Sequence, residues 1–221
     1  MIRSSSSRRL IRVRDPILEL LKPLHRRMRN QKIAIFLQLA RERDATLLDL
    51  GGGPGISGES HAVHQFFGSV VVVNRSRPMT EGSSFSSLPF VMADGCSLPF
   101  SSRSFDWVFS NAVIEHVGGW ARQRRFADEI RRVAAKGYFV ATPNRFFPIE
   151  PHTLLPFYQF MDPKRQAQLV RFSPGYMREP LEIHLLSPRD LQCLFPEAHV
   201  LKMGFPVFPN NLVAMYRADR I

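Results

Sequence analysis

The sequence predicts an α/β fold with a doubly wound, mostly parallel sheet, and two observations carry that prediction. From residue 46 onward, short apolar runs typical of buried strands alternate with amphipathic stretches typical of helices. The first apolar run, TLLDL (46–50), leads directly into the glycine-rich turn GGGPG (51–55). In such folds the ligand site lies at the carboxyl ends of the strands, where a glycine turn brings backbone close to a ligand.

Seven strands are expected in order along the chain. The apolar runs predict strands at 46–50, 69–73, 90–93, 105–110, 137–141, 198–203 and 212–217. Helices are expected at 56–67, at 120–135 with Gly137 ending the helix, and from Ser187, which we expect to cap a helix with Pro188 in its first turn. The fold class is therefore a doubly wound, mostly parallel seven-stranded sheet.

Residues 143–180 interrupt this alternation. The run TPNRFFPIEPHTLLPFYQFMDP is rich in prolines and aromatic residues, a poor strand and a broken helix. Because this insert follows the carboxyl end of a strand, we expect it to be a lid that contributes substrate contacts. Deleting it is expected to abolish turnover and to spare cofactor binding.

The N-terminal part holds most of the net charge of +11, with 12 Lys and Arg and three acids in residues 1–43. We expect a basic flexible arm at 1–15, and N-terminal helices within 16–44, one over 16–29 that Pro23 interrupts and a second over 31–43. One domain is expected at 45–221, and it includes the insert. The arm fits an anionic membrane surface, RNA or a solvated tail. Its Ser- and Arg-rich composition also resembles an organelle transit peptide.

Two features bear on location. The longest apolar runs fall far short of the ~20 residues that a membrane-spanning helix needs. Cys96 and Cys193 are far apart and show no metal-ligand spacing, so we expect buried free thiols, a reducing compartment and no metal site. The expected location is the cytoplasm, with membrane association through the basic arm left open.

The glycine turn has three interpretations. A Walker-type phosphate loop is excluded because no Lys follows the glycines. A dinucleotide pattern is formally present as Gly53, Gly55 and Gly58, and it needs a ribose-binding acid about 20 residues on. That place holds Asn74, followed by two arginines that suit a 2′-phosphate, so an NADP-dependent reductase stays open.

The third interpretation starts from Asp49, which the dinucleotide pattern leaves unexplained. The run DLGGGPG (49–55) resembles motif I of the class I S-adenosylmethionine-dependent methyltransferases. The resemblance implies that Asp49, Gly51, Gly53 and Gly55 contact the cofactor. A carboxylate suits the cationic amino-acid end of that cofactor, and glycines let the main chain approach it without a Cβ in the way.

Two downstream runs agree with that resemblance in order and spacing over about residues 46–142. FVMADGCSLPF (90–100) resembles the family's third motif, which implies that Asp94, with Gly95 beside it, approaches the adenine amino group. FDWVFSNAVIEHV (105–117) resembles the motif on the fourth strand, which implies a polar turn of Asn111, Glu115 and His116 beside the reactive methyl.

Asn74 departs from the family pattern. The family usually ends its second strand in Asp or Glu, which holds the ribose hydroxyls, and here a neutral amide takes that place. The loss of a charge-assisted hydrogen bond implies cofactor binding weaker by ~1–2 kcal/mol. The departure also leaves open an inactive protein that kept the fold as a binding or assembly module.

The acceptor is implied by a last resemblance. TPNRFFPIEPHTLLPF (142–157) resembles a segment of the type 11 branch, whose members act on small molecules, lipids or glycans. An RNA methyltransferase is the alternative, although the (N/D)PP(Y/F) run of amino-methylating enzymes is missing from the fourth strand. The implied reaction is in-line transfer of a methyl group from S-adenosylmethionine to such an acceptor.

Histidines supply the candidate catalytic residues. For an oxygen acceptor that needs a base, His116 and His152 are the candidates, because both can reach the carboxyl edge of the sheet. Glu150, flanked by prolines with His152, is a further candidate for substrate contact. His61 and His64 lie on the predicted first helix of the domain and are expected at the surface.

Overall fold

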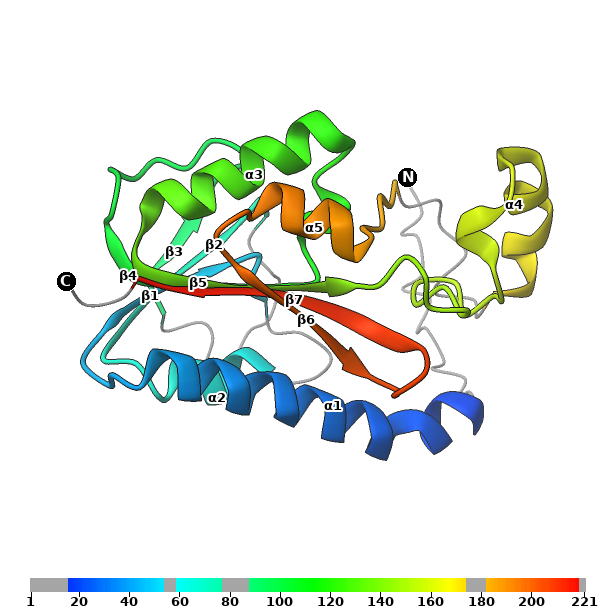
Figure 1. Ribbon diagram of the computed structural model, residues 1–221, viewed down its shortest axis with the longest axis horizontal. Coiled ribbons are helices and arrows are strands. Elements are labelled where there is room, and N and C mark those ends of the chain that lie inside the picture. Colours follow the sequence, from blue (N-terminus) through cyan, green and yellow to red (C-terminus); the bar gives the residue numbers. More distant parts are fainter. Residues whose placement is uncertain (1–15, 54–58, 77–87, 174–181, 219–221) are drawn as a thin grey trace, which may run out of the picture.

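Seven strands form a single sheet in the computed structural model (Figure 1). The structure describes residues 16–53, 59–76, 88–173 and 182–218, and for residues 16–25 and 59–61 it describes the backbone only. The strand order is β3-β2-β1-β4-β5-β7-β6. The strands are β1 (Thr46–Leu50), β2 (Ser69–Asn74), β3 (Phe90–Met92), β4 (Phe105–Asn111), β5 (Ala134–Pro143), β6 (His199–Gly204) and β7 (Pro209–Arg217). Strands β1 to β5 pair in parallel and β7 runs antiparallel to β5 and β6, which confirms the predicted fold class.

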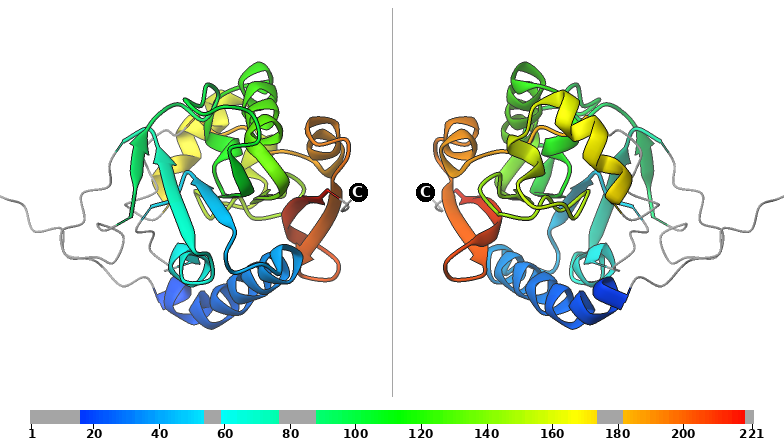
Figure 2. Two further views of the ribbon diagram at one scale, coloured as in Figure 1. Left: turned by 90° about the vertical axis from the view of Figure 1, so that its left-hand side faces the viewer. Right: turned by 90° about the vertical axis from the view of Figure 1, so that its right-hand side faces the viewer.

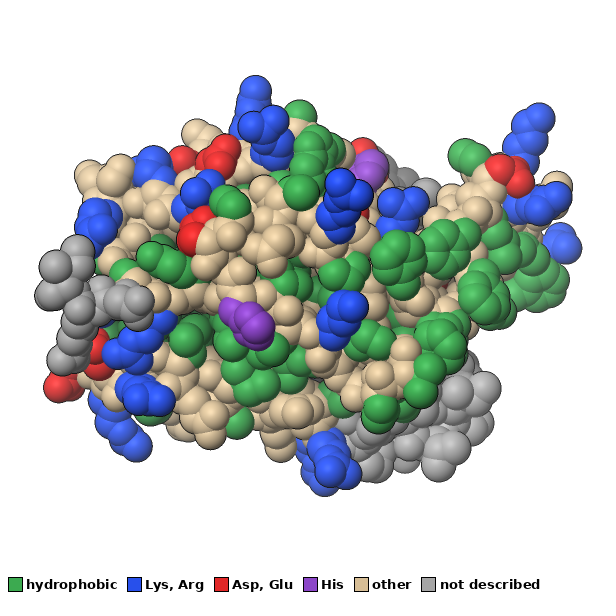
Figure 3. Space-filling view, in the orientation of Figure 1, with side chains coloured by type: hydrophobic (Ala, Val, Ile, Leu, Met, Phe, Trp, Pro, Cys, Tyr) green, Lys and Arg blue, Asp and Glu red, His purple; other side chains and the backbone are tan. Residues whose placement is uncertain are grey.

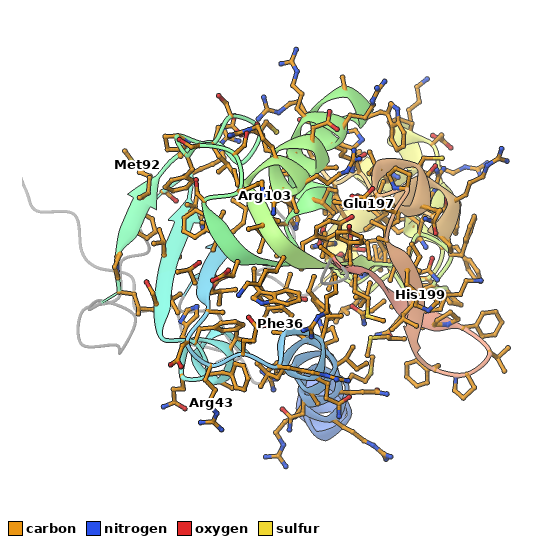
Figure 4. The ribbon with its side chains drawn as sticks, turned by 60° about the vertical axis from the view of Figure 1, so that its left-hand side comes forward. Phe36, Arg43, Met92, Arg103, Glu197 and His199 are labelled. Carbon is orange, nitrogen blue, oxygen red and sulfur yellow. The ribbon has the colours of Figure 1, made fainter. Side chains whose placement is uncertain are left out.

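Helices cover both faces of the sheet (Figures 1 and 2). Helices α1 (Pro16–Ala40) and α2 (Glu59–His64) lie on one face, and α3 (Trp120–Val133) and α5 (Pro188–Leu194) lie on the other. Two buried apolar clusters fill the spaces between the layers. Phe36 of α1, which Figure 4 labels between the helix and the sheet, packs edge-on against Trp107 of β4, and both side chains are fully buried.

Helix α1 is continuous through Pro23, whereas the sequence predicted two helices. A proline removes one backbone hydrogen bond and kinks a helix without having to end it. The apolar positions Ile33, Phe36 and Ala40 fall on one face of α1 and pack in the cluster beneath the sheet. This packing holds the C-terminal half of α1 against the sheet.

Gly137 does not end a helix, contrary to the prediction. Helix α3 ends at Val133, and β5 begins directly at Ala134 without a loop. A Cβ on Gly137 would overlap the carbonyl oxygen of Tyr216 on β7 and the ring of Trp107. This glycine is therefore required for close approach of two strands rather than for a helix cap.

The C-terminal elements agree with the prediction. Ser187 caps α5, because its hydroxyl accepts a hydrogen bond from the Asp190 amide at 3.1 Å while the Asp190 carboxylate accepts from the Ser187 amide at 2.9 Å. Cys193 on the same helix is exposed and Cys96 is half-buried, so the expectation of two buried thiols is wrong, although both are free. Cys193 faces solvent because the apolar face of α5 carries Leu191 and Leu194 instead.

The insert lies beyond the carboxyl ends of the strands (Figures 1 and 2). It contains the short helices η3 (Tyr158–Phe160), α4 (Pro163–Leu169) and η4 (Val170–Phe172). Asp162 caps α4 by accepting a hydrogen bond from the Arg165 amide at 3.1 Å. The predicted arm at 1–15 lies outside the described residues. Among the described helices, none has the length and apolar character to cross a membrane.

Candidate functional site

The carboxyl end of β1 places Asp49 under the glycine turn. Asp49 is buried, with 2% of its surface exposed. Gly51 follows in the left-handed region with φ of 86°, and its amide donates a hydrogen bond to the carbonyl of Val73 on β2 at 2.7 Å. A Cβ on Gly52 would overlap the Asp49 carboxylate. The turn therefore packs directly on a buried carboxylate, a fit that only glycine permits.

His64 contacts that carboxylate. Its Nε2 lies 2.7 Å from Oδ2 of Asp49, and its side chain is 7% exposed. The expectation that His64 is a surface residue is wrong, because α2 runs back along the sheet and ends over β1. Gly53 is half-buried in the turn, and Gly55 and His61 lie outside the residues whose side chains or positions are described.

Asn74 ends β2 beside the glycine turn. Its Nδ2 donates to the carbonyl oxygens of Gly51 at 3.4 Å and Gly52 at 3.1 Å, and its Oδ1 accepts from the Arg75 amide at 2.7 Å. An aspartate has no donor for these two carbonyls. The amide therefore fixes the turn in a way that the acid of the family pattern does not.

Asp94 follows β3 and already has two partners. Its Oδ1 accepts from the Cys96 amide at 3.0 Å, and its Oδ2 lies 2.6 Å from Nη2 of Arg122 on α3. The hydrogen bond from Arg122 lowers the pKa of Asp94 below its ordinary value, with the Cys96 amide as the next cause. Gly95 is buried, and a Cβ there would press on the ring of Phe126.

Asn111, the last residue of β4, contacts α1. Its Oδ1 accepts a hydrogen bond from Nζ of Lys32 at 2.8 Å. The basic helix α1 thus contributes a cation to the same edge of the sheet. Asp49, Asn74, Asp94 and Asn111 stand at the ends of four consecutive strands, because the sheet orders them as β3-β2-β1-β4.

Three titratable side chains meet where β4 faces the insert. Glu115 and His116 belong to the short helix η2 (Ile114–His116), and His152 comes from the insert. The Nε2 atoms of His116 and His152 are 3.2 Å apart, and Oε1 of Glu115 lies 3.9 Å from the His116 Nε2. The two predicted catalytic histidines are therefore in direct contact.

Burial changes the pKa values of Glu115 and His116. Glu115 has no exposed surface, and burial raises its pKa to about 7, although the hydroxyl of Thr142 donates to its Oε2 at 3.0 Å. Burial also lowers the pKa of His116, with His152 as the next cause. His116 is therefore neutral near pH 7 and has a lone pair for a proton or a metal ion.

Glu150 holds His152 in place. Its Oε1 lies 2.7 Å from Nδ1 of His152, and its Oε2 accepts from the backbone amides of His152 and Thr153 at 3.0 and 2.6 Å. The Thr153 hydroxyl adds a fourth bond at 2.8 Å. Burial by itself would raise the pKa of Glu150, but these hydrogen bonds outweigh it and the pKa is lowered. An ionised Glu150 keeps the proton of His152 on Nδ1 and directs Nε2 at His116.

A cavity of about 750 Å³ opens beside this group. It lies between the insert, the start of α3 and the segment before α5. Among the residues that line it are Trp120, Arg145, Glu150, His152, Tyr158 and His184. His152 thus belongs both to the cavity and to the contact with His116, which follows β4.

Some functional side chains were not predicted. Lys32, His64 and Arg122 reach the strand ends from helices, and nothing in their local sequence marks them. Glu115 stood in the predicted polar turn, but its burial depends on how β5 and the insert pack around it. Among the described residues, its Oε1 has no hydrogen-bond partner. Only the assembled fold brings these groups together.

Comparison with known proteins agrees with the fold and the central motifs. Residues 48–141 match the family model described as a methyltransferase domain. No curated protein matches the chain. The matched residues begin within β1, include the glycine turn and end within β5.

Solved structures extend the likeness to most of the chain. A putative methyltransferase in complex with the Haloferax volcanii Trm112 methyltransferase activator is 15% identical, with a TM-score of 0.57 and coverage of 92% of this chain and 93% of that one. The 1,6-didemethyltoxoflavin-N1-methyltransferase of Burkholderia thailandensis, with bound S-adenosylhomocysteine, is 14% identical, with a TM-score of 0.57 and coverage of 90% and 85%. Magnesium protoporphyrin IX methyltransferase of Synechocystis is 11% identical, with a TM-score of 0.59 and coverage of 91% and 86%. The chain has the class I methyltransferase fold.

Proposed function

We propose that this chain, whose residues 48–141 match the methyltransferase-domain family model, transfers a methyl group from S-adenosylmethionine to a small-molecule, lipid or glycan acceptor. The observation that carries the proposal is the buried carboxylate of Asp49 beneath a glycine turn, with polar side chains at the three neighbouring strand ends. When bound, the cofactor supplies an electrophilic methyl group on a sulfonium.

The described residues fit that cofactor at both of its ends. Asp49 offers negative charge to the amino-acid end, and Gly51 and Gly53 carry no Cβ to stand between the backbone of the turn and the cofactor. Asp94 and Gly95 suit the adenine edge, although Arg122 already holds one oxygen of Asp94. Gly55 belongs to the same proposed set by its place in the motif.

Asn74 and Asn111 differ from a simple cofactor ligand. The amide group of Asn74 is used on the carbonyls of the turn, which leaves its Oδ1 as the acceptor for ribose. We propose that Asn74 acts mainly by fixing the turn, and that Asn111, paired with Lys32, borders the reactive methyl. With the neutral Asn74 in place of an acid, the protein binds the cofactor through fewer charged contacts than the family pattern provides.

The cavity beside the insert is the proposed acceptor site. Its lining combines the aromatic rings of Trp120 and Tyr158 with the polar side chains of Arg145, Gln166 and His184. Mixed apolar and polar lining suits a mid-sized organic acceptor that carries a polar group. The insert supplies much of the lining, which supports its proposed role as a lid.

His116 and His152 stand at the boundary between the cavity and β4. Glu150 accepts a hydrogen bond from Nδ1 of His152, which leaves Nε2 of His152 as the nitrogen that can take a proton from an acceptor hydroxyl. If His116→Ala and His152→Ala each kept the full rate on an identified acceptor, this role would be abandoned.

Calorimetric titration of the purified chain tests the proposed function. We expect micromolar binding of S-adenosylmethionine and S-adenosylhomocysteine and none of NADPH. If the folded protein binds neither adenosyl compound, the result would favour an inactive binding or assembly module. Binding of NADPH alone would point to a reductase. A chain without residues 145–172 is expected to bind the cofactor and to lack turnover. Loss of both would contradict the lid.

We further propose a cytoplasmic protein that contacts anionic membranes through its basic arm. Exposed large apolar side chains support the proposal, and Figure 3 shows them gathered near the insert and the β6–β7 turn. They are Phe146, Ile149, Phe157, Phe160 and Phe172 on the insert and Phe205, Val207 and Phe208 on the turn. Asn210 beside that turn contacts Met28 of α1, so the basic helix adjoins the apolar surface.

Vesicle sedimentation tests the membrane proposal. We expect binding to phosphatidylserine vesicles that weakens with salt, and little binding to phosphatidylcholine. Removing residues 1–15 should abolish the preference for anionic lipid. Phe208→Ser should weaken binding to the vesicles and leave the preference for anionic lipid unchanged. Binding to RNA in place of vesicles would assign the arm to the alternative partner.

A further inference from the structure

Glu115, His116 and His152 bring three metal-ligating groups together beside the cavity. One ligand atom from each lies within 4.8 Å of the others. Imidazole nitrogens and a carboxylate oxygen are the ligand types of zinc and iron(II) sites in which protein supplies three ligands. The sequence predicted no metal site, because its two cysteines show no metal-ligand spacing. Residues 115 and 152 are far apart along the chain, and only the fold brings them together.

Glu115 is the first observation that points to a ligand. Its side chain has no exposed surface, and within the described residues its Oε1 has no hydrogen-bond partner. An unpaired carboxylate oxygen in the interior is unfavourable unless a cation or a donor compensates it. This Oε1 atom of Glu115 lies 3.9 Å from the Nε2 of His116.

The orientation of His152 is the second observation. Glu150 binds Nδ1 of His152 at 2.7 Å and is itself held by Thr153. Metal-binding histidines commonly donate their other ring nitrogen to a carboxylate, which fixes the tautomer and the direction of the lone pair. The lone pair of the His152 Nε2 therefore points into the cluster.

The spacing of the two histidines suits an ion. Two imidazole nitrogens bound to tetrahedral zinc at 2.0–2.1 Å lie about 3.3 Å apart. The Nε2 atoms of His116 and His152 are 3.2 Å apart, with the rings at 89°. Oε1 of Glu115 lies 3.9 Å from the His116 Nε2, and all three ligand atoms lie within 4.8 Å of one another, so the Glu115 carboxylate must move closer to complete the set.

We propose that Glu115, His116 and His152 bind a divalent transition-metal ion, zinc foremost, with Glu150 as the residue that orients His152. Three protein ligands leave at least one coordination position for the acceptor or water, and His152 lines the cavity from which they would come. Binding of the ion does not depend on the proposed function; only the role of the ion in methyl transfer does. There the ion would lower the pKa of an acceptor hydroxyl, and the histidines would serve as ligands instead of bases.

Metal binding by the full chain tests the proposal directly. The chelator-treated protein is titrated with ZnCl₂ by calorimetry and with CoCl₂ by visible absorption, because tetrahedral cobalt gives a strong spectrum. We expect one equivalent to bind. The variants Glu115→Gln, His116→Ala and His152→Ala should each bind at least 100-fold more weakly, and Glu150→Gln about 10- to 100-fold more weakly.

A matched histidine variant provides the control. His199 on β6, labelled in Figure 4, is exposed and is not one of the three cluster residues, so His199→Ala should bind zinc like the unaltered chain. Glu115→Gln keeps the size of the side chain, and thermal unfolding with S-adenosylmethionine titration verifies that each variant is folded. Failure of the cofactor to bind the unaltered chain would contradict the proposed function and leave zinc binding to be measured on its own.

Two results would overturn the metal site. One is the absence of a stoichiometric zinc equivalent at micromolar concentrations, in which case the histidines form a hydrogen-bonded pair and the base role stands. The other is zinc binding that survives loss of both His116 and His152.

Discussion

Replacing Asp49 by Asn should separate the electrostatic role of this residue from its structural one. The amide keeps the shape of the carboxylate beneath the glycine turn and removes its negative charge. Asp49 is 2% exposed, and its Oδ2 lies 2.7 Å from His64 Nε2. Because little solvent reaches this position, water does not compensate for the lost negative charge. We expect weaker binding of the cofactor with the fold retained.

The magnitude follows from the burial of Asp49. Two unit charges ~4 Å apart at an effective dielectric of 20 interact by about 4 kcal/mol, which is an upper limit. A hydrogen bond to a charged group is worth about 1.5–3 kcal/mol, so Asp49→Asn should raise the dissociation constant roughly 10- to 150-fold. If Asp49 acts on the ammonium group, S-adenosylmethionine and S-adenosylhomocysteine weaken equally. If it acts on the sulfonium, only the former weakens.

Isothermal calorimetry with both compounds measures this effect, and Asp106→Asn is the matched control. Asp106 sits near the start of β4, at the opposite edge of the sheet, where it accepts hydrogen bonds from Thr46 and pairs with Lys136. That variant should lose stability and keep cofactor affinity. The reasoning fails if Asp49→Asn binds both compounds as the unaltered chain does, or if Asp106→Asn weakens binding equally.

Three further predictions concern stability. The Arg132 guanidinium, with the Leu98 amide, lowers the pKa of Glu129, so the stabilisation by the Glu129 carboxylate is present above an unfolded pKa of about 4.3 and is lost as pH falls through the folded pKa. Glu129→Gln should therefore lower the free energy of unfolding by about 1–2 kcal/mol at pH 7 in urea titrations and change it little near pH 3. An equal loss at both pH values would contradict the ion pair. Gly137→Ala should cost about 1–3 kcal/mol in the same assay, because the Tyr216 carbonyl in a paired strand cannot move away, and an unchanged midpoint would be incompatible with that packing. Ser187→Ala should cost about 1 kcal/mol by loss of the helix cap, measured by thermal unfolding, with Ser187→Thr as the variant expected to keep most of it.

The strands and the cofactor edge could be predicted because their signals are local. An apolar run such as 46–50 requires burial on both faces, and the turn after it requires glycine at Gly51 because φ is positive there. Ser187 and Pro188 specify a helix start through bonds within one turn. Each of these depends on residues a few positions apart.

Local signals were misleading where packing competed with them. Pro23 predicted a break in α1, but the helix continues and its apolar face packs on the sheet. Gly137 resembled a helix cap, but it is needed where β5 meets β7. His64 on an amphipathic stretch resembled a surface residue, but α2 carries it onto Asp49.

By itself the sequence determined the α/β class, the strand order in the chain and the four strand ends that form the proposed cofactor edge. Tertiary structure decided which titratable groups meet there. His116 and His152 are 36 positions apart, and the contact between them depends on the path of the insert over the sheet. The burial of Glu115 likewise depends on neighbours from β5 and the insert, because the desolvation of a carboxylate is a property of everything packed around it.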